Sequence, residues 1–366
     1  FESPTAFALD RIHLCKARAM RQYTGAEFKG LQEASSGPPT ATKVGLFVFF
    51  ALARAIHPTI IAASKEADPE TGQKSYPYST VSVVMGETVV TLIITQLMVL
   101  ANGGMGEWKA IWRPLPMKVF SFIGFAFALG DYLELASIGR LGGGLLLSKL
   151  VVTSKLVITA LMMWAIKGTR QTTLQWNFLL LVMLSMSVYM LGDKQCSGTP
   201  GGGISIMGVS MVLLKVTVSC FSAVLSDKYM KEYRSKPIYM QLVQIKCGWF
   251  AAIFVISLVD GETWQRGFFA GWKGVTVGVL ASFAVKSFST MYLLAILDSV
   301  LKSIGEATAV MAIYAAQVIL PCFDCPFEFP TFLSVMVVIL SVTAYVSSKS
   351  VVEKAEKYDQ YITAKL

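Results

Sequence analysis

The sequence predicts an all-α polytopic membrane protein with ten transmembrane helices arranged as a 5+5 inverted repeat. Three observations predict it. The chain of 366 residues is 54% hydrophobic and only 15% charged, too apolar for a soluble protein whose surface must face water. Its apolar runs have about the 20 residues that a spanning helix needs. Short connectors, many marked by glycine or proline, separate these runs.

The runs are helices because lipid offers no hydrogen-bond partner to an unpaired backbone group. The first five run from the N-terminal tail to the glycine-rich connector GTPGGG at 198–203, and the other five follow it. In chain order we expect spans at about 44–64, 79–101, 118–138, 143–166, 174–192, 204–226, 238–259, 272–296, 300–320 and 330–348.

The distribution of basic residues predicts the topology. With ten spans and a cytosolic N-terminus, most lysines and arginines fall on the cytosolic side, as the positive-inside rule requires. The opposite side would hold Lys65, Lys74, Arg140, Lys194, Arg266 and Lys273. The net charge of +9 therefore reflects topology rather than nucleic-acid binding, and both termini are expected in the cytosol.

Four segments follow from this layout: a polar tail at 1–42, two five-helix halves at 43–197 and 198–349, and a charged tail at 350–366. Because five is odd, the second half enters the membrane from the opposite side, and related halves would form inverted repeats with a substrate site between them. The tail contains an amphipathic stretch at 7–21, which we expect to be a surface helix or disordered. The opening FESP is similar to the start of processed plastid proteins, and a trimmed chain is the alternative.

Cysteine and histidine usage argues against a metal or catalytic centre. Six cysteines are too few for a disulfide framework, although Cys322 and Cys325 form a CxxC that could be a local disulfide or two reduced thiols. His13 and His57 are the chain's two histidines. No nucleophile–base pair stands out, so we expect neither an enzyme nor a cofactor.

Charged residues inside apolar runs require an explanation, because a charge at the bilayer centre costs about 2.5–3.5 kcal/mol. Such residues face a cavity or pair with an opposite charge. Structural pairing is expected for Arg54, Lys149, Lys215 and Lys246. Acidic residues available in or near the spans include Glu87, Asp131, Glu134, Asp227, Asp298 and Glu306.

Lys149 and Lys155 belong to one predicted span. Six residues correspond to about 600° around a helix, so their side chains point in different directions. Thr153, Ser154 and Thr159 give the Lys155 region a polar stripe, which favours a cavity-lining role for Lys155 and a structural pair for Lys149.

Asp298 and Lys302 are four residues apart on one helical face, so either they pair with each other or both belong to a substrate site. A basic cavity between helices indicates an anionic substrate such as a nucleotide. No GxxxxGK[ST] phosphate loop is present, which excludes this route to ATP-driven pumping and favours a secondary transporter.

Four stretches now resemble a known family: Gly86-Glu87, Lys155–Leu161 (KLVITAL), Phe221–Lys228 (FSAVLSDK) and Asp298–Ser303 (DSVLKS). They are similar to motifs of nucleotide-sugar transporters, in the CMP-sialic acid and UDP-galactose branch of the drug/metabolite transporter superfamily. The resemblance covers roughly residues 43–348. It implies a ten-helix inverted-repeat fold, a Golgi or endoplasmic-reticulum membrane, and exchange of a nucleotide sugar for a nucleoside monophosphate.

The chain also departs from the family pattern. Val90 and Ala295 stand where the family has lysines, and Val152-Thr153 replaces its Tyr-Gln. The asparagine and paired glycines of the eighth span align with Ser282, Lys286 and Ser287. The substrate site is thus expected to comprise Lys155, Lys302, Asp298, Lys286, Glu87 and Asp131.

Two functions fit these observations. The first is an antiporter for a nucleotide sugar or related organic phosphate, acting as a monomer or homodimer, with Asp298 orienting Lys302. The second is a transporter-like fold kept as a non-transporting structural subunit of a large organellar membrane complex, for example in a plastid. The lost motif lysines and the missing initiator methionine favour the second reading.

Overall fold

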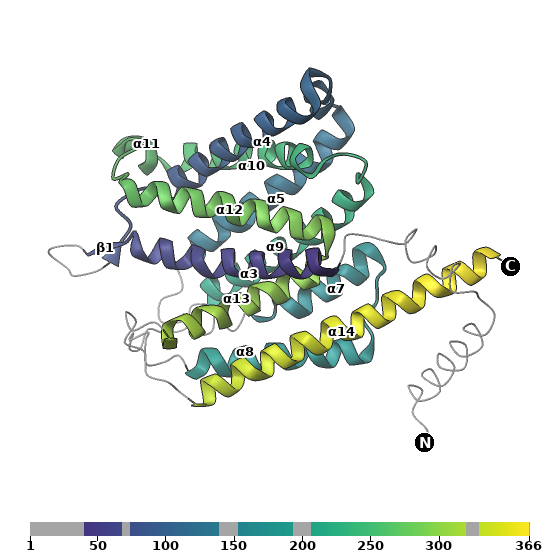
Figure 1. Ribbon diagram of the computed structural model, residues 1–366. Helices are drawn as coiled ribbons and strands as arrows, with labels where there is room; N and C mark the ends of the chain where they lie inside the picture. Colours follow the sequence, from purple (N-terminus) through teal and green to yellow (C-terminus); the bar gives the residue numbers. More distant parts are fainter. Residues whose placement is uncertain (1–39, 68–73, 139–152, 193–205, 320–328, 366) are drawn as a thin grey trace.

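The protein is a bundle of long helices, seen here in a computed structural model (Figure 1). The structure describes residues 40–67, 74–138, 153–192, 206–319 and 329–365. Its helices are α3 (Thr40–Ala63), α4 (Thr80–Ile111), α5 (Pro114–Ile138), α7 (Lys155–Lys167), α8 (Thr173–Gly192), α9 (Ile206–Glu232), α10 (Ile238–Asp260), α11 (Glu262–Arg266), α12 (Gly274–Ile296), α13 (Ser299–Ile319) and α14 (Phe329–Lys365). Two-residue strands β1 (Glu66–Ala67) and β2 (Lys74–Ser75) pair antiparallel between α3 and α4.

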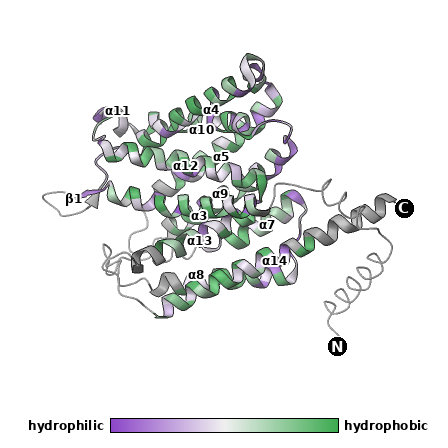
Figure 2. Ribbon diagram, viewed as in Figure 1, coloured by the Kyte–Doolittle hydropathy of each residue, from purple (hydrophilic) through white to green (hydrophobic). Residues whose placement is uncertain are grey.

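The helices fall where the apolar runs predict them, and the protein is an integral membrane protein. Within the described residues, six helical stretches are long and apolar enough to cross a bilayer: α4 and α12 over their full length, and parts of α3, α9, α10 and α14. Of the other four predicted spans, α5, α8 and α13 lie close to 118–138, 174–192 and 300–320, while α7 covers the second half of 143–166, whose first residues lie outside the described ranges. Figure 2 shows apolar residues along the helices and hydrophilic residues concentrated near their ends. Ten spans in two inverted halves stay a prediction.

Local sequence signals fix several helix ends. Before α8, Thr172 and Gln175 form a capping box, in which each side chain bonds the other's backbone N–H. Gly168 ends α7 in a left-handed conformation with φ of 71°. Asp298 precedes α13 and accepts the backbone N–H of Leu301 at 2.8 Å, which caps that helix.

Glycines let α5 and α10 cross with their backbones in contact. A Cβ at Gly124 would overlap the carbonyl oxygen of Ile245, and a Cβ at Gly248 would overlap that of Ser121. Small residues at such crossings allow close helix packing in membranes. This crossing holds α10 against α5 at the level of Lys246.

Replacing Gly124 by alanine is therefore expected to force α5 and α10 apart, at a cost of about 1–3 kcal/mol, the range for overpacked cores. The measurement is the apparent melting temperature of the purified protein in detergent. Gly45→Ala is the matched control, because a Cβ at Gly45 of α3 meets nothing within 4 Å. Equal melting temperatures for the two variants would contradict the close crossing.

Candidate functional site

Three cations from three helices surround one carboxylate in the bundle. Glu306 of α13 forms ion pairs with Arg54 of α3, with Lys155 of α7 at 2.6 Å, and with Lys302 one turn earlier on α13 at 3.5 Å. All four side chains are largely buried, and the cluster carries excess positive charge. We call these four residues the Glu306 cluster.

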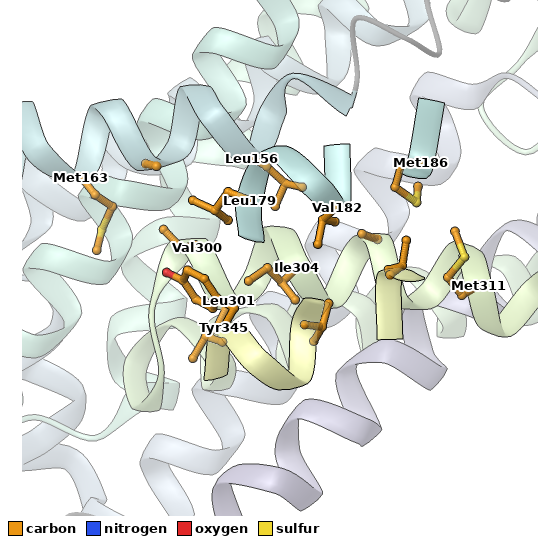
Figure 3. Close-up of a cluster of buried hydrophobic side chains, with 14 of the residues drawn as sticks. Leu156, Met163, Leu179, Val182, Met186, Val300, Leu301, Ile304, Met311 and Tyr345 are labelled. Atoms are coloured by element: carbon orange, nitrogen blue, oxygen red, sulfur yellow. The ribbon is translucent and has the colours of Figure 1, made fainter. Parts of the chain in front are cut away.

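The pattern of α13 explains why its charges face α3 and α7. Val300, Leu301, Ile304 and Met311 belong to an apolar core shared with α7, α8 and α14 (Figure 3). Lys302 and Glu306 are spaced four apart between these apolar positions, so they occupy another face of the helix.

The same logic applies to α7. Leu156, Ala160 and Met163 enter the apolar core, while Lys155 and Thr159, four residues apart, lie on a different face. Burial of the apolar faces therefore directs the charged faces of α7 and α13 toward each other.

Neutral polar groups connect α7, α9 and α13 beside the cluster. The hydroxyl of Thr159 donates to the carbonyl of Lys155 at 2.7 Å and lies 3.2 Å from both Cys220 Sγ and Ser303 Oγ. Lys302 also sits over the ring of Phe127 of α5, 5.7 Å from its centroid. These contacts fix the surroundings of Lys155 and Lys302.

His57 of α3 and Lys286 of α12 lie next to the cluster. His57 lies three residues after Arg54, which places it about one helical turn further along the same face. Its Nδ1 is 3.0 Å from Ser282 Oγ, and Lys286 Nζ of α12 is 3.5 Å from its Nε2. Lys286 also lies 4.6 Å from the ring centroid of Phe283. A basic side chain and an imidazole thus adjoin the three cations.

Glu87 takes part in a separate buried network. Lys246 of α10 contacts both of its carboxylate oxygens, at 2.7 and 2.8 Å, and Ser287 of α12 donates to it at 3.0 Å. Thr91 donates at 2.8 Å from the next turn of α4. The side chains of Lys246 and Glu87 are 0% and 2% exposed. This network ties α4, α10 and α12 together.

Removing one member of this pair should destabilise the protein more than removing both. Lys246→Met is expected to cost about 3–5 kcal/mol, because it leaves the Glu87 charge buried without compensation. The double variant Glu87→Gln with Lys246→Met should recover most of that loss. Apparent melting temperatures of the three proteins measure it; a double variant as unstable as Lys246→Met would contradict the pairing.

Two further carboxylates lie where α7, α9, α13 and α14 approach one another. Asp227 is fully buried and pairs with Lys167 at 2.8 Å and Lys231 at 2.6 Å. Asp298 pairs with Lys349 of α14. Asp298 thus caps α13 and pairs with Lys349 of α14, while Lys302 pairs with Glu306.

The structure brings together some of the predicted site residues and separates others. Lys155 and Lys302 meet at Glu306, Lys286 adjoins them through His57, and Glu87 and Asp298 occupy the two networks described above. Asp131 lies on α5 and Lys215 on α9, and both have polar or electrostatic partners. Lys149, Cys322 and Cys325 lie outside the described residues.

The site predicted from sequence omits three members of this region: Glu306, His57 and Arg54, which was assigned to a structural pair. The spacing of four between Lys302 and Glu306 is the signal that could have found Glu306. No short-range signal links Arg54 to it, since 252 residues separate them.

The chain is similar to transporters of known class. UDP-galactose translocator 1 of Caenorhabditis elegans is 23% identical over 256 residues, which cover 66% of this chain and 72% of that protein. CMP-sialic acid transporter 3 of Oryza sativa subsp. indica is 22% identical over 207 residues, covering 55% and 50%. These likenesses confirm the resemblance found in the sequence.

A solved crystal structure of another protein superposes with a TM-score of 0.61 at 12% identity, over 84% of this chain and 96% of that one. At that identity the likeness shows a shared fold. The family model of nucleotide-sugar transporters matches residues 46–346, which run from within α3 to within α14 and include all the helices between them. The chain therefore belongs to the nucleotide-sugar transporter family.

Proposed function

We propose that this protein is an antiporter that exchanges a nucleotide sugar, or a related organic phosphate, for a nucleoside monophosphate by alternating access. The observation that carries the proposal is the Glu306 cluster, in which three cations from α3, α7 and α13 converge on one carboxylate. A phosphate offers the same kind of oxygen acceptors as that carboxylate, so it can replace Glu306 as the partner of Arg54 and Lys155.

Each cation has a distinct use. The guanidinium of Arg54 is planar and suits bidentate contact with a phosphate, whereas the ammonium groups of Lys155 and Lys302 are compact point charges. Glu306 offsets part of their positive charge when no substrate is bound, which limits the cost of burying like charges together. Lys286, beside His57, is placed to meet a second anionic group of the substrate. Glu87 and Asp131 would line the path of the transported substrate.

The pattern of helix contacts supports an inverted repeat. With α3, α4, α5, α7 and α8 as one half and α9, α10, α12, α13 and α14 as the other, contacts between the halves occur in matched pairs. The α5–α9 contact corresponds to α12–α3, the α7–α9 contact to α13–α3, and the α5–α10 contact to α12–α4. Because the Glu306 cluster joins helices of both halves, rocking one half against the other would change its access. The proposal places the protein in a Golgi or endoplasmic-reticulum membrane with both termini cytosolic.

The proposal is tested by ligand-dependent stability. The purified protein is screened in detergent against nucleoside monophosphates and nucleotide sugars of different base and sugar. A ligand that binds the folded state raises its apparent melting temperature, by an amount that grows with ligand concentration over Kd. We expect one base to be selected, and Lys155→Ala to lose the effect. No stabilisation by any nucleotide would contradict nucleotide binding.

One observation also suits the second candidate, a non-transporting subunit of a large organellar complex: every cation of the Glu306 cluster pairs with Glu306, and such ion pairs between α3, α7 and α13 would also serve as a structural brace. Native gel analysis of mild detergent extracts of the source membranes separates the two. Migration as a monomer or homodimer supports the transporter. Comigration with a complex of several hundred kilodaltons would support the subunit.

A further inference from the structure

Residues 105–118, between the break in α4 and the first turn of α5, do not continue the direction of α4. With 32 residues, α4 would extend about 48 Å if it were straight, longer than the roughly 30 Å hydrocarbon core. Gly104 interrupts it with φ of 62° and ψ of −165°, a combination open essentially to glycine alone. The segment after Gly104 therefore takes a new direction before Arg113 leads into α5. We call residues 105–118 the α4–α5 corner.

One side of the corner is anchored to α10. Trp108 and Ile111 pack with Met240 and Val243 in a small apolar cluster. Glu107 also pairs with Lys236, in the turn before α10, at 3.2 Å. These contacts fix which side of the corner faces outward.

The outward side combines apolar and basic residues. Met105, Trp112 and Leu115 are 58%, 47% and 67% exposed. Lys109, Arg113 and Lys118 are exposed among them. Over the described ranges these three cations form no ion pair or side-chain hydrogen bond, in contrast to the buried lysines of the bundle.

We propose that the α4–α5 corner is a binding site for the headgroups of anionic phospholipids. A helix that outgrows the hydrocarbon core ends at the membrane interface, where tryptophan is favoured and where basic side chains meet lipid phosphates. The arginine and lysines can contact the phosphodiester and a second acidic group, while Trp112 and Leu115 insert among the upper acyl chains. A partner with an anionic head and an apolar body fits this mixture of residues. The site is distinct from the Glu306 cluster and independent of the transported substrate.

Lipid titration of the full-length protein tests the proposal. Native mass spectrometry in a mild detergent counts phosphatidylglycerol and phosphatidylcholine bound to the wild type. The key variant carries Lys109→Gln, Arg113→Gln and Lys118→Gln. At about 1 kcal/mol per basic residue near a membrane surface, its affinity for phosphatidylglycerol should fall on the order of a hundredfold. Binding of phosphatidylcholine should change little.

A matched control removes the same charge from the opposite helix ends, by Lys65→Gln, Arg266→Gln and Lys273→Gln. It should keep the preference for phosphatidylglycerol. Equal losses in both triple variants, or no preference in the wild type, would overturn the proposal.

Gly104→Ala tests whether lipid binding depends on the backbone shape of the corner, because it leaves the charges of the corner unchanged. A Cβ there meets nothing within 4 Å, so the substitution acts through backbone strain alone. Weaker binding of phosphatidylglycerol with all charges present is the expected result. Wild-type affinity would show that the break in α4 does not build the site.

Discussion

Replacing Lys155 by alanine should abolish exchange while leaving the fold intact. The cation contributes to substrate binding through desolvated contacts with phosphate, and truncating such a partner costs about 2–5 kcal/mol, which corresponds to losses of roughly thirtyfold to several thousandfold. The fold survives because Glu306 keeps Arg54 and Lys302 as partners. Exchange is measured in proteoliposomes, and folding by size-exclusion chromatography and apparent melting temperature.

Lys273→Ala is the control for Lys155→Ala, because Lys273 is an exposed lysine whose ion-pair partner, Glu66, lies beyond the end of α3 and outside the Glu306 cluster. It should exchange at the wild-type rate. A Lys155→Ala protein that exchanges normally would remove Lys155 from the substrate site.

Glu306→Gln should differ from Lys155→Ala in both properties. It should lower the stability of the empty protein but increase the rise in melting temperature that the ligand induces. Without the carboxylate, three buried cations repel one another, and the empty protein should lose about 3–5 kcal/mol. A bound phosphate would restore the missing negative charge. The nucleotide-induced rise in melting temperature should therefore exceed that of the wild type.

The pair Glu87 and Lys246 provides the control for this second prediction. Glu87→Gln also leaves a buried lysine uncompensated and should lower stability, but its ligand-induced shift should not exceed that of the wild type. If Glu306→Gln showed the same shift as Glu87→Gln, phosphate would not take the place of the Glu306 carboxylate.

Much of the fold is readable from the sequence because a bilayer imposes one simple requirement on each segment. Apolar runs of about 20 residues must become helices, and α3, α4, α9, α10, α12 and α14 contain stretches that fit the requirement and overlap their predicted ranges, although α4 continues to Ile111, beyond the predicted end at 101. The sequence does not reveal helix crossings such as that at Gly124 and Gly248, because close approach depends on two glycines 124 residues apart.

The ion-pair partner of Lys302 could not be predicted from the sequence. Asp298 and Glu306 both stand four residues from it, one on each side, so spacing alone cannot choose between them. In the structure Asp298 is engaged by Lys349 of α14 and by the backbone of Leu301, while Glu306 meets Lys302. The choice depends on a helix some 50 residues away along the chain, which local patterns do not encode.

Exchange by the wild-type protein decides whether it is an antiporter. Proteoliposomes are loaded with the nucleoside monophosphate that stabilises the protein most, and uptake of the matching labelled nucleotide sugar is followed. An antiporter should show rapid uptake that requires the internal monophosphate and is lost in Lys155→Ala. Uptake that is absent under all loading conditions, or that is the same in loaded and empty vesicles, would contradict an antiporter.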